Sequence, residues 1–119
     1  MHQSTYTLYG IPNCDSCRKA LRALESTGLQ PSFHDLRADP VDRNQLRQWI
    51  EALGPDRLIN KRSTTWRKLK DEAPEELDPE AALALCQAHP TLIKRPVLEH
   101  PDGALTLGFD PQVYAGLTA

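Results

Sequence analysis

The chain contains few of the residues that would mark it as a secreted or disulfide-stabilised protein. Only three of its 119 residues are cysteine, and aromatic residues make up 6%. An odd, small number of cysteines in a chain long enough to bury a core argues against a secreted disulfide framework. We therefore expect a reducing compartment, the cytoplasm, where closely spaced cysteines serve catalysis or bind a metal.

Long apolar runs and an excess of one charge are also missing. No apolar stretch approaches the roughly 20 residues that a membrane-spanning helix needs, and residues 1–5 lack the basic and apolar regions of a secretory signal. The net charge is only −2. We therefore expect no membrane and no direct nucleic-acid partner. The length fits a single domain over residues 1–119, which we expect to be monomeric.

Two cysteines separated by two residues are the most informative feature that is present. Cys14 and Cys17 stand where a predicted strand, 5–9, gives way through residues 10–13 to a helix that begins near Asp15. Unpaired N–H groups and the helix dipole lower the pKa of a thiol at such a position and can also hold an oxyanion. We predict that Cys14 is an exposed catalytic nucleophile and Cys17, one turn further, the thiol that resolves its disulfide.

Three neighbours of Cys14 are candidates for substrate binding. Arg18 adds positive charge to the first turn of the helix. Asn13 could shape the turn before the helix or cap its first N–H groups. Ser16 could donate a hydrogen bond to the Cys14 thiolate or only cap the helix.

The third cysteine allows a different interpretation. Cys86 and His89 have a spacing that could complete a Cys₃His zinc site with Cys14 and Cys17. Against this, Cys86 lies beside Leu85 on the apolar face of an expected helix. We therefore expect Cys86 to fill the core and no metal to be bound.

Further elements follow from hydrophobic periodicity and turn residues. We expect a helix from Asp42, capped with the help of Gln45, and a hairpin around the pair Asp102-Gly103. The expected strands are 32–36, 96–99 and 104–107, and the expected helical segments are 42–53, pieces near 58–59 and 66–69, 78–89 and 110–117. This β-α-β, helical block, β-β-α order predicts an α/β fold with one mixed sheet and a helical insertion at about 41–90.

The motifs together resemble those of the ArsC/Spx family, and within it those of the YffB-like proteins. The matching segments are Gly10-Ile11-Pro12-Asn13-Cys14-x-x-Cys17-Arg18-Lys19-Ala20, Arg62-Ser63-Thr64-Thr65-Trp66-Arg67-Lys68-Leu69, His89-Pro90-x-Leu92-Ile93-Lys94-Arg95-Pro96-Val97-Leu98 and Gly108-Phe109. They run in order over nearly the whole chain. The resemblance implies a thioredoxin-like fold with a helical insertion.

The resemblance also implies roles for individual residues. Cys14 occupies the nucleophile position of the arsenate reductases, Arg95 and Arg62 match arginines that hold the oxyanion, and Pro96 matches a proline kept in cis beside the nucleophile. A guanidinium suits the bidentate binding of a tetrahedral oxyanion or a carboxylate, which supports a catalytic role for Arg95 independently.

Two departures from the arsenate reductases bear on the substrate. The stretch 107–110 has no cation where those enzymes carry a further arginine, and Cys17 is present where they generally lack a second cysteine. We therefore expect a thiol–disulfide oxidoreductase with glutathione as co-substrate and no bound cofactor. The alternative is an Spx-like redox-sensing regulator that binds the C-terminal domain of the RNA polymerase α subunit, a hypothesis to which the spacing of Gly54 and Arg62 contributes.

Overall fold

The computed structural model describes residues 5–69, 71 and 77–117. The chain divides into two compact units, one formed by residues up to 35 and from 95 onward, the other by residues 36–94. The second unit includes the whole of the predicted insertion, 41–90. The description of 1–119 as a single domain stays a prediction, and each unit is described by itself below.

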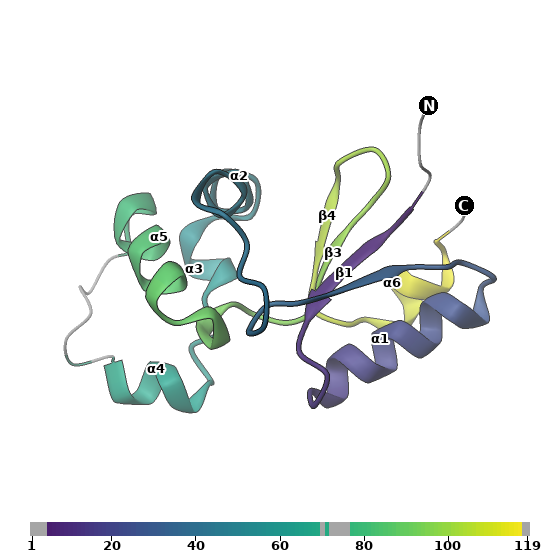
Figure 1. The fold of residues 1–119 in the computed structure, drawn as a ribbon, viewed down its shortest axis with the longest axis horizontal. Helices are drawn as coiled ribbons and strands as arrows, with labels where there is room; N and C mark the ends of the chain where they lie inside the picture. The colour runs from purple at the N-terminus through teal and green to yellow at the C-terminus, as the bar shows by residue number, and fades with distance from the viewer. Residues whose placement is uncertain (1–4, 70, 72–76, 118–119) are drawn as a thin grey trace. The chain divides into compact units, whose positions relative to one another are not determined.

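The first unit contains a four-stranded mixed sheet, as the element order predicts. Its strands are β1 (Thr7–Gly10), β2 (Ser32–Asp35), β3 (Val97–Glu99) and β4 (Leu105–Leu107), in the spatial order β2-β1-β3-β4 (Figure 1). β1 is parallel to β2 and antiparallel to β3, and β3 is antiparallel to β4. Helix α1 (Asp15–Ser26) provides the crossover that a parallel pair of strands needs.

The core of this unit lies between the sheet and two helices. α1 packs against α6 (Pro111–Ala115), on one face of the sheet (Figure 1). Seven residues form its buried cluster: Tyr6, Leu8, Ala20, Leu24, Leu29, Leu98 and Tyr114. Cys17, Ala20 and Leu24 are buried on one face of α1, whereas Leu21 is only partly buried.

The second unit is helical. Its elements are α2 (Arg43–Leu53), α3 (Pro55–Leu58), α4 (Thr64–Leu69), α5 (Pro79–Ala88) and a short 3₁₀ helix, η1 (Pro90–Leu92). α2 packs against α5 and buries its apolar face, which consists of Leu46, Trp49, Ile50 and Leu53. The helical character of the insertion is therefore confirmed.

One local prediction in this unit is wrong. Ile59, expected in a helical piece with Leu58, is extended and forms an antiparallel bridge with Ile93. The N–H of Lys94 donates to the carbonyl of Leu58 at 2.7 Å, and the N–H of Asn60 donates to the carbonyl of Leu92 at 2.7 Å. A partner more than 30 positions away leaves no trace in local periodicity, so hydrogen bonding outside the segment overrides the helical pattern.

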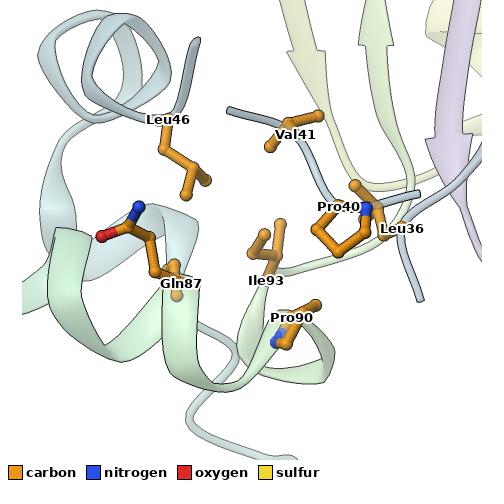
Figure 2. A pocket seen from close by; sticks show the side chains of 8 residues that line it. Leu36, Pro40, Val41, Leu46, Gln87, Pro90 and Ile93 are labelled. Atoms are coloured by element: carbon orange, nitrogen blue, oxygen red, sulfur yellow. The ribbon is translucent and has the colours of Figure 1, made fainter. Parts of the chain in front are cut away.

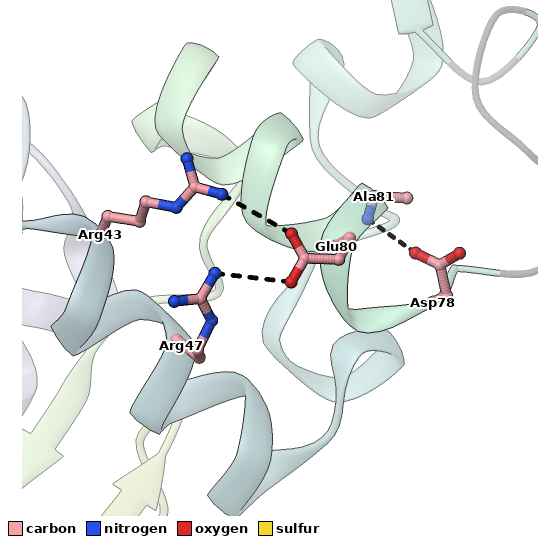
Figure 3. Close-up of polar contacts among 5 residues, drawn as sticks. All are labelled: Arg43, Arg47, Asp78, Glu80 and Ala81. Carbon is pink, nitrogen blue, oxygen red and sulfur yellow. Dashed lines mark hydrogen bonds and ion pairs between the residues drawn. The ribbon is translucent and has the colours of Figure 1, made fainter.

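Aspartates begin the two long helices of this unit, as predicted. Asp42 Oδ1 accepts from the N–H of Gln45 at 2.8 Å. Asp78 Oδ1 accepts from the N–H of Ala81 at 2.7 Å (Figure 3). Each carboxylate satisfies an N–H group that has no acceptor within its helix and lies at the positive end of the helix dipole.

Ion pairs between α2 and α5 contribute less. The Glu80 carboxylate lies between Arg43, at 3.7 Å, and Arg47, at 3.4 Å (Figure 3). All three side chains are exposed. Pairs of this kind contribute at most about 1 kcal/mol, so the apolar contact of α2 with α5 is the main source of stability here.

The Asp42 cap can be tested by substitution. Asp42→Ala removes the acceptor for the Gln45 N–H and should lower the free energy of unfolding by about 1 kcal/mol. Asp42→Asn keeps an acceptor and should stay within a few tenths of a kcal/mol of the parent. Urea denaturation followed by circular dichroism measures both, and equal loss in the two variants would contradict the capping role.

Candidate active site

The site is built at the junction of β1 and α1. β1 ends at Gly10, a short turn follows, and α1 begins at Asp15 with Cys14 as its N-cap residue in an extended conformation. The N–H of Cys14 donates to the carbonyl of Ile11 at 3.2 Å, and the carbonyl of Cys14 accepts from Arg18 at 3.0 Å. These bonds hold Cys14 at the positive end of the helix, where it is partly exposed.

Several groups act on the Cys14 sulfur. Partial burial raises the pKa of Cys14, but hydrogen bonding from the Cys17 backbone and thiol outweighs it, together with the hydrogen bond and charge of the Arg95 guanidinium. The pKa of Cys14 is therefore below the ordinary value for a thiol. A thiolate is the reactive form of cysteine, so this thiol is primed as a nucleophile.

Cys17 has the opposite character. It is 1% exposed, and burial together with the neighbouring Cys14 raises its pKa to about 12. Its thiol stays protonated and faces the Cys14 sulfur as a hydrogen-bond donor. All three cysteines are free thiols in this structure, so Cys14 and Cys17 form a reduced pair with one ionisable and one protonated member.

Gly10 makes room for the Cys17 sulfur. A methyl group on Gly10 would overlap Cys17 Sγ and lie 3.2 Å from its Cβ. The backbone of Gly10 does not have a positive φ, so no turn geometry demands glycine here. In the sequence Gly10 was only a strand breaker and part of a motif, because this steric role depends on a contact between β1 and α1.

Arg95 and Pro96 come from the other end of the unit, just before β3. Arg95 is partly buried and its guanidinium lies at the Cys14 sulfur. The peptide bond between Arg95 and Pro96 is cis, as the resemblance implies. Pro96 is buried, and its carbonyl accepts from the N–H of Gly108 at 2.8 Å. The structure thus brings Arg95 to Cys14 across about 80 residues of sequence.

The remaining candidates lie around the start of α1 or belong to the other unit. Asn13, Ser16 and Arg18 are exposed around the start of α1, and Ser16 is not among the groups that shift the pKa of Cys14. Arg62 belongs to the 36–94 unit, is exposed, and its N–H donates to Asn60 Oδ1 at 3.1 Å. The substrate-binding roles of these four residues stay predictions.

Cys86 is a core residue, as predicted. It is 1% exposed, and burial raises its pKa to about 12. It lines a small cavity of about 130 Å³ in the helical unit; Leu36, Pro40, Val41, Leu46, Gln87, Pro90 and Ile93 complete the lining (Figure 2). A protonated, enclosed thiol of this kind is chemically inert.

Among the residues that the structure describes, no three side chains of the types His, Cys, Asp and Glu gather where they could hold a metal ion. No helix in that part of the chain has the length and apolarity needed to cross a membrane.

A second feature that the sequence did not indicate adjoins the thiol pair. An open apolar hollow of about 280 Å³ lies beside the start of α1, lined by Ile11, Pro12, Cys17, Arg18, Leu21 and Phe33. The sequence showed only two separate apolar residues there, Leu21 in the expected helix and Phe33 in the expected strand 32–36. Both are partly accessible, and Phe33 is 38% exposed.

Titration should separate the three thiols. We expect ultraviolet thiolate absorbance to rise by the equivalent of one sulfur below the ordinary thiol range, because Cys17 and Cys86 hold their protons up to about pH 12. Arg95→Gln removes a group that stabilises the Cys14 thiolate, so the midpoint should move to higher pH, and Arg95→Lys should move it less. An unchanged midpoint in Arg95→Gln would contradict the assignment.

The steric role of Gly10 has its own test. Gly10→Ala must displace the Cys17 sulfur, so the pKa of Cys14 should rise and oxidation to the Cys14–Cys17 disulfide should slow by about 100-fold. Gly116→Ala is the matched control, because its methyl group would meet the Val113 carbonyl oxygen at an ordinary 3.6 Å. Thiolate titration and the kinetics of disulfide formation measure both variants; parental behaviour of Gly10→Ala would refute the role.

Solved structures similar to this chain share its fold. A protein named YffB superposes with a TM-score of 0.85 at 41% identity, over 92% of this chain and 96% of that protein. An arsenate reductase (ArsC) related protein from Brucella melitensis superposes with a TM-score of 0.77 at 37% identity, over 96% and 94%. The β-α-β and β-β-α arrangement around one mixed sheet is thus the thioredoxin-like fold of these proteins.

Curated relatives point the same way. An uncharacterised protein of Haemophilus influenzae is 44% identical over 91% of this chain and 94% of its own length. The global transcriptional regulator Spx of Listeria innocua is 30% identical over 77% of this chain and 71% of its own length. The model of the ArsC family matches residues 9–117. This chain therefore belongs to the ArsC family.

Proposed function

We propose that this protein is a cytoplasmic thiol–disulfide oxidoreductase that reduces mixed disulfides with glutathione as its reductant. The observation that carries the proposal is the Cys14 sulfur, partly exposed and held by Cys17 and Arg95 with a lowered pKa. Membership of the ArsC family, with an arsenate reductase related protein among its similar structures, supports thiol-based redox chemistry.

The first step is attack by Cys14. Its thiolate bonds to one sulfur of the substrate disulfide, the substrate S–S bond breaks, and the other sulfur leaves as a thiolate that takes a proton from water. The Arg95 guanidinium and the N–H groups at the start of α1 stabilise negative charge on the sulfurs during the exchange. The product is a mixed disulfide on Cys14.

The second step needs the buried thiol to ionise. The negative charge of Cys14 is one cause of the raised pKa of Cys17, and that charge is gone once Cys14 is in a disulfide, while Arg95 still favours the thiolate. Cys17 then loses its proton to water and attacks Cys14 Sγ, and the substrate sulfur leaves. Because burial, the larger cause, remains, free glutathione competes with Cys17 at this step.

Glutathione closes the cycle. One glutathione thiolate opens the Cys14–Cys17 disulfide, and a second attacks the resulting adduct, which gives oxidised glutathione and both protein thiols. The two electrons that reduce the substrate thus come from two glutathione molecules, and no bound cofactor takes part.

Substitution of the cysteines tests this cycle. Cys14→Ser should abolish turnover of a glutathione mixed disulfide, whereas Cys17→Ser should retain a slower reaction that depends on the concentration of free glutathione. Cys86→Ala is the control and should keep the parental rate, because the Cys86 thiol is enclosed in the other unit. Release of the thiol is followed by absorbance or mass spectrometry. Full activity in Cys14→Ser would overturn the mechanism.

A redox-sensing regulator is the second candidate, favoured by the identity with Spx. In this function, oxidation of Cys14 and Cys17 is a signal, and the partner is the C-terminal domain of the RNA polymerase α subunit. The spacing of Gly54 and Arg62 adds little to this candidate. Gly54 has a φ of 91° and ends α2, and this alone explains why glycine stands there. Redox-dependent binding to that domain without reductase turnover would favour the regulator.

A further inference from the structure

The hollow beside α1 adjoins the pair formed by Cys14 and Cys17. Cys17 lines the hollow, and its thiol faces Cys14. Ile11 also lines it, and the Ile11 carbonyl accepts a hydrogen bond from the N–H of Cys14. The rest of its lining consists of Pro12, Leu21, Phe33 and the stem of Arg18. A substrate whose sulfur is bonded to Cys14 would therefore have its neighbouring groups at the mouth of this hollow.

The chemistry of the hollow does not match glutathione. Glutathione carries two carboxylates, an amine and peptide groups but no apolar side chain that could fill a wall of leucine, isoleucine and phenylalanine. The volume of about 280 Å³ lies just under the range of about 300–1,000 Å³ that is usual for sites of whole drug-sized ligands. The hollow therefore suits one or two apolar side chains, not an entire cofactor.

The edge of the sheet suits an extended peptide. β2 is the outermost strand on its side, and the N–H of Ser32 points inward to the Tyr6 carbonyl at 2.9 Å. Because neighbouring residues of a strand point their backbone groups in opposite directions, the N–H and C=O of Phe33 point away from β1. An exposed edge of this kind can pair with an extended segment, while a pocket next to it takes a side chain.

Charge adds a further constraint on the occupant. Arg18 is exposed at the wall of the hollow. Among the described residues no ion pair within 4 Å holds Arg18; its charge acts on the Asp15 carboxylate, which is itself paired with Lys19 at 3.1 Å. Together with Arg95 and the start of α1, Arg18 makes the surroundings of the thiol pair positive. A neutral or acidic segment is favoured and a basic one disfavoured.

We propose that the hollow binds an apolar side chain next to the cysteine of an extended protein segment, so that the substrate is a protein cysteine in a mixed disulfide with glutathione. The inference rests on the proposed function and names its substrate class. Cys14 attacks the peptide sulfur, the S–S bond to glutathione breaks, and glutathione leaves as a thiolate that is protonated by water. Cys17 then releases the reduced peptide and forms the disulfide with Cys14.

Two glutathionylated peptides test the proposal directly. Both are capped pentapeptides with a central cysteine, flanked on each side by leucine in one and by serine in the other. We expect kcat/KM to be about tenfold higher for the leucine peptide, a ratio typical of a small apolar pocket. In Cys17→Ser, mass spectrometry should find the peptide, not glutathione, bonded to Cys14.

Matched variants locate the preference. Phe33→Thr keeps a residue suited to a strand and should reduce the preference for the leucine peptide to less than twofold. Val113→Thr is the control, because Val113 is similarly apolar and exposed, at 44% against 38% for Phe33, but belongs to α6 and does not line the hollow. It should keep the full preference.

The outcomes separate this proposal from the one on which it rests. Equal kcat/KM for both peptides, with turnover that still depends on Cys14, would overturn the substrate class and leave the oxidoreductase in place. Absence of turnover with either peptide and with glutathione disulfides in general would overturn the proposed function itself. The assignment would also be refuted if the preference for the leucine peptide survived in Phe33→Thr. It would be refuted equally if only glutathione mixed disulfides of small apolar thiols, and not the leucine peptide, were reduced faster.

Discussion

The interaction on which the site depends is the contact of the Cys14 sulfur with Cys17 and Arg95. Without it, partial burial would keep the Cys14 thiol protonated, because burial raises the pKa of Cys14 and is the largest single influence on it. Three separate features supply the contact: the start of α1 orients the Cys17 backbone, Gly10 leaves space for the Cys17 sulfur, and the segment before β3 delivers Arg95. The sheet holds these features together.

Burial divides the two thiols of the pair into different roles. Cys14 is partly exposed and ionises easily, whereas Cys17 is enclosed between β1 and α1 and holds its proton to about pH 12. Cys86 is buried to the same extent with a similarly raised pKa, yet it belongs to the other unit and lines a cavity there. Proximity to Cys14, not thiol chemistry alone, therefore makes Cys17 a candidate partner in exchange.

Local patterns predicted the elements well wherever the residues concerned are close in sequence. The caps at Asp42 and Asp78, the apolar faces of α1 and α2 and the hairpin around Gly103 are all indicated by residue types a few positions apart. Ile59 was assigned wrongly because its partner, Ile93, lies far along the chain. The hollow was not predicted for the same reason, because its lining residues come from three separate segments: the turn before α1, α1 itself and β2.

The sequence by itself determined which sulfur chemistry is available: two thiols at the start of a helix after a strand, an arginine and a proline far along the chain, and the order of elements that places them in one fold. Only the tertiary structure decided which groups act on Cys14, why Gly10 must be glycine, and that Leu21 and Phe33 line an accessible hollow. The physical reason is that the pKa of a thiol and the shape of a pocket depend on distances across the fold, whereas helix starts, turns and apolar faces depend on neighbours along the chain.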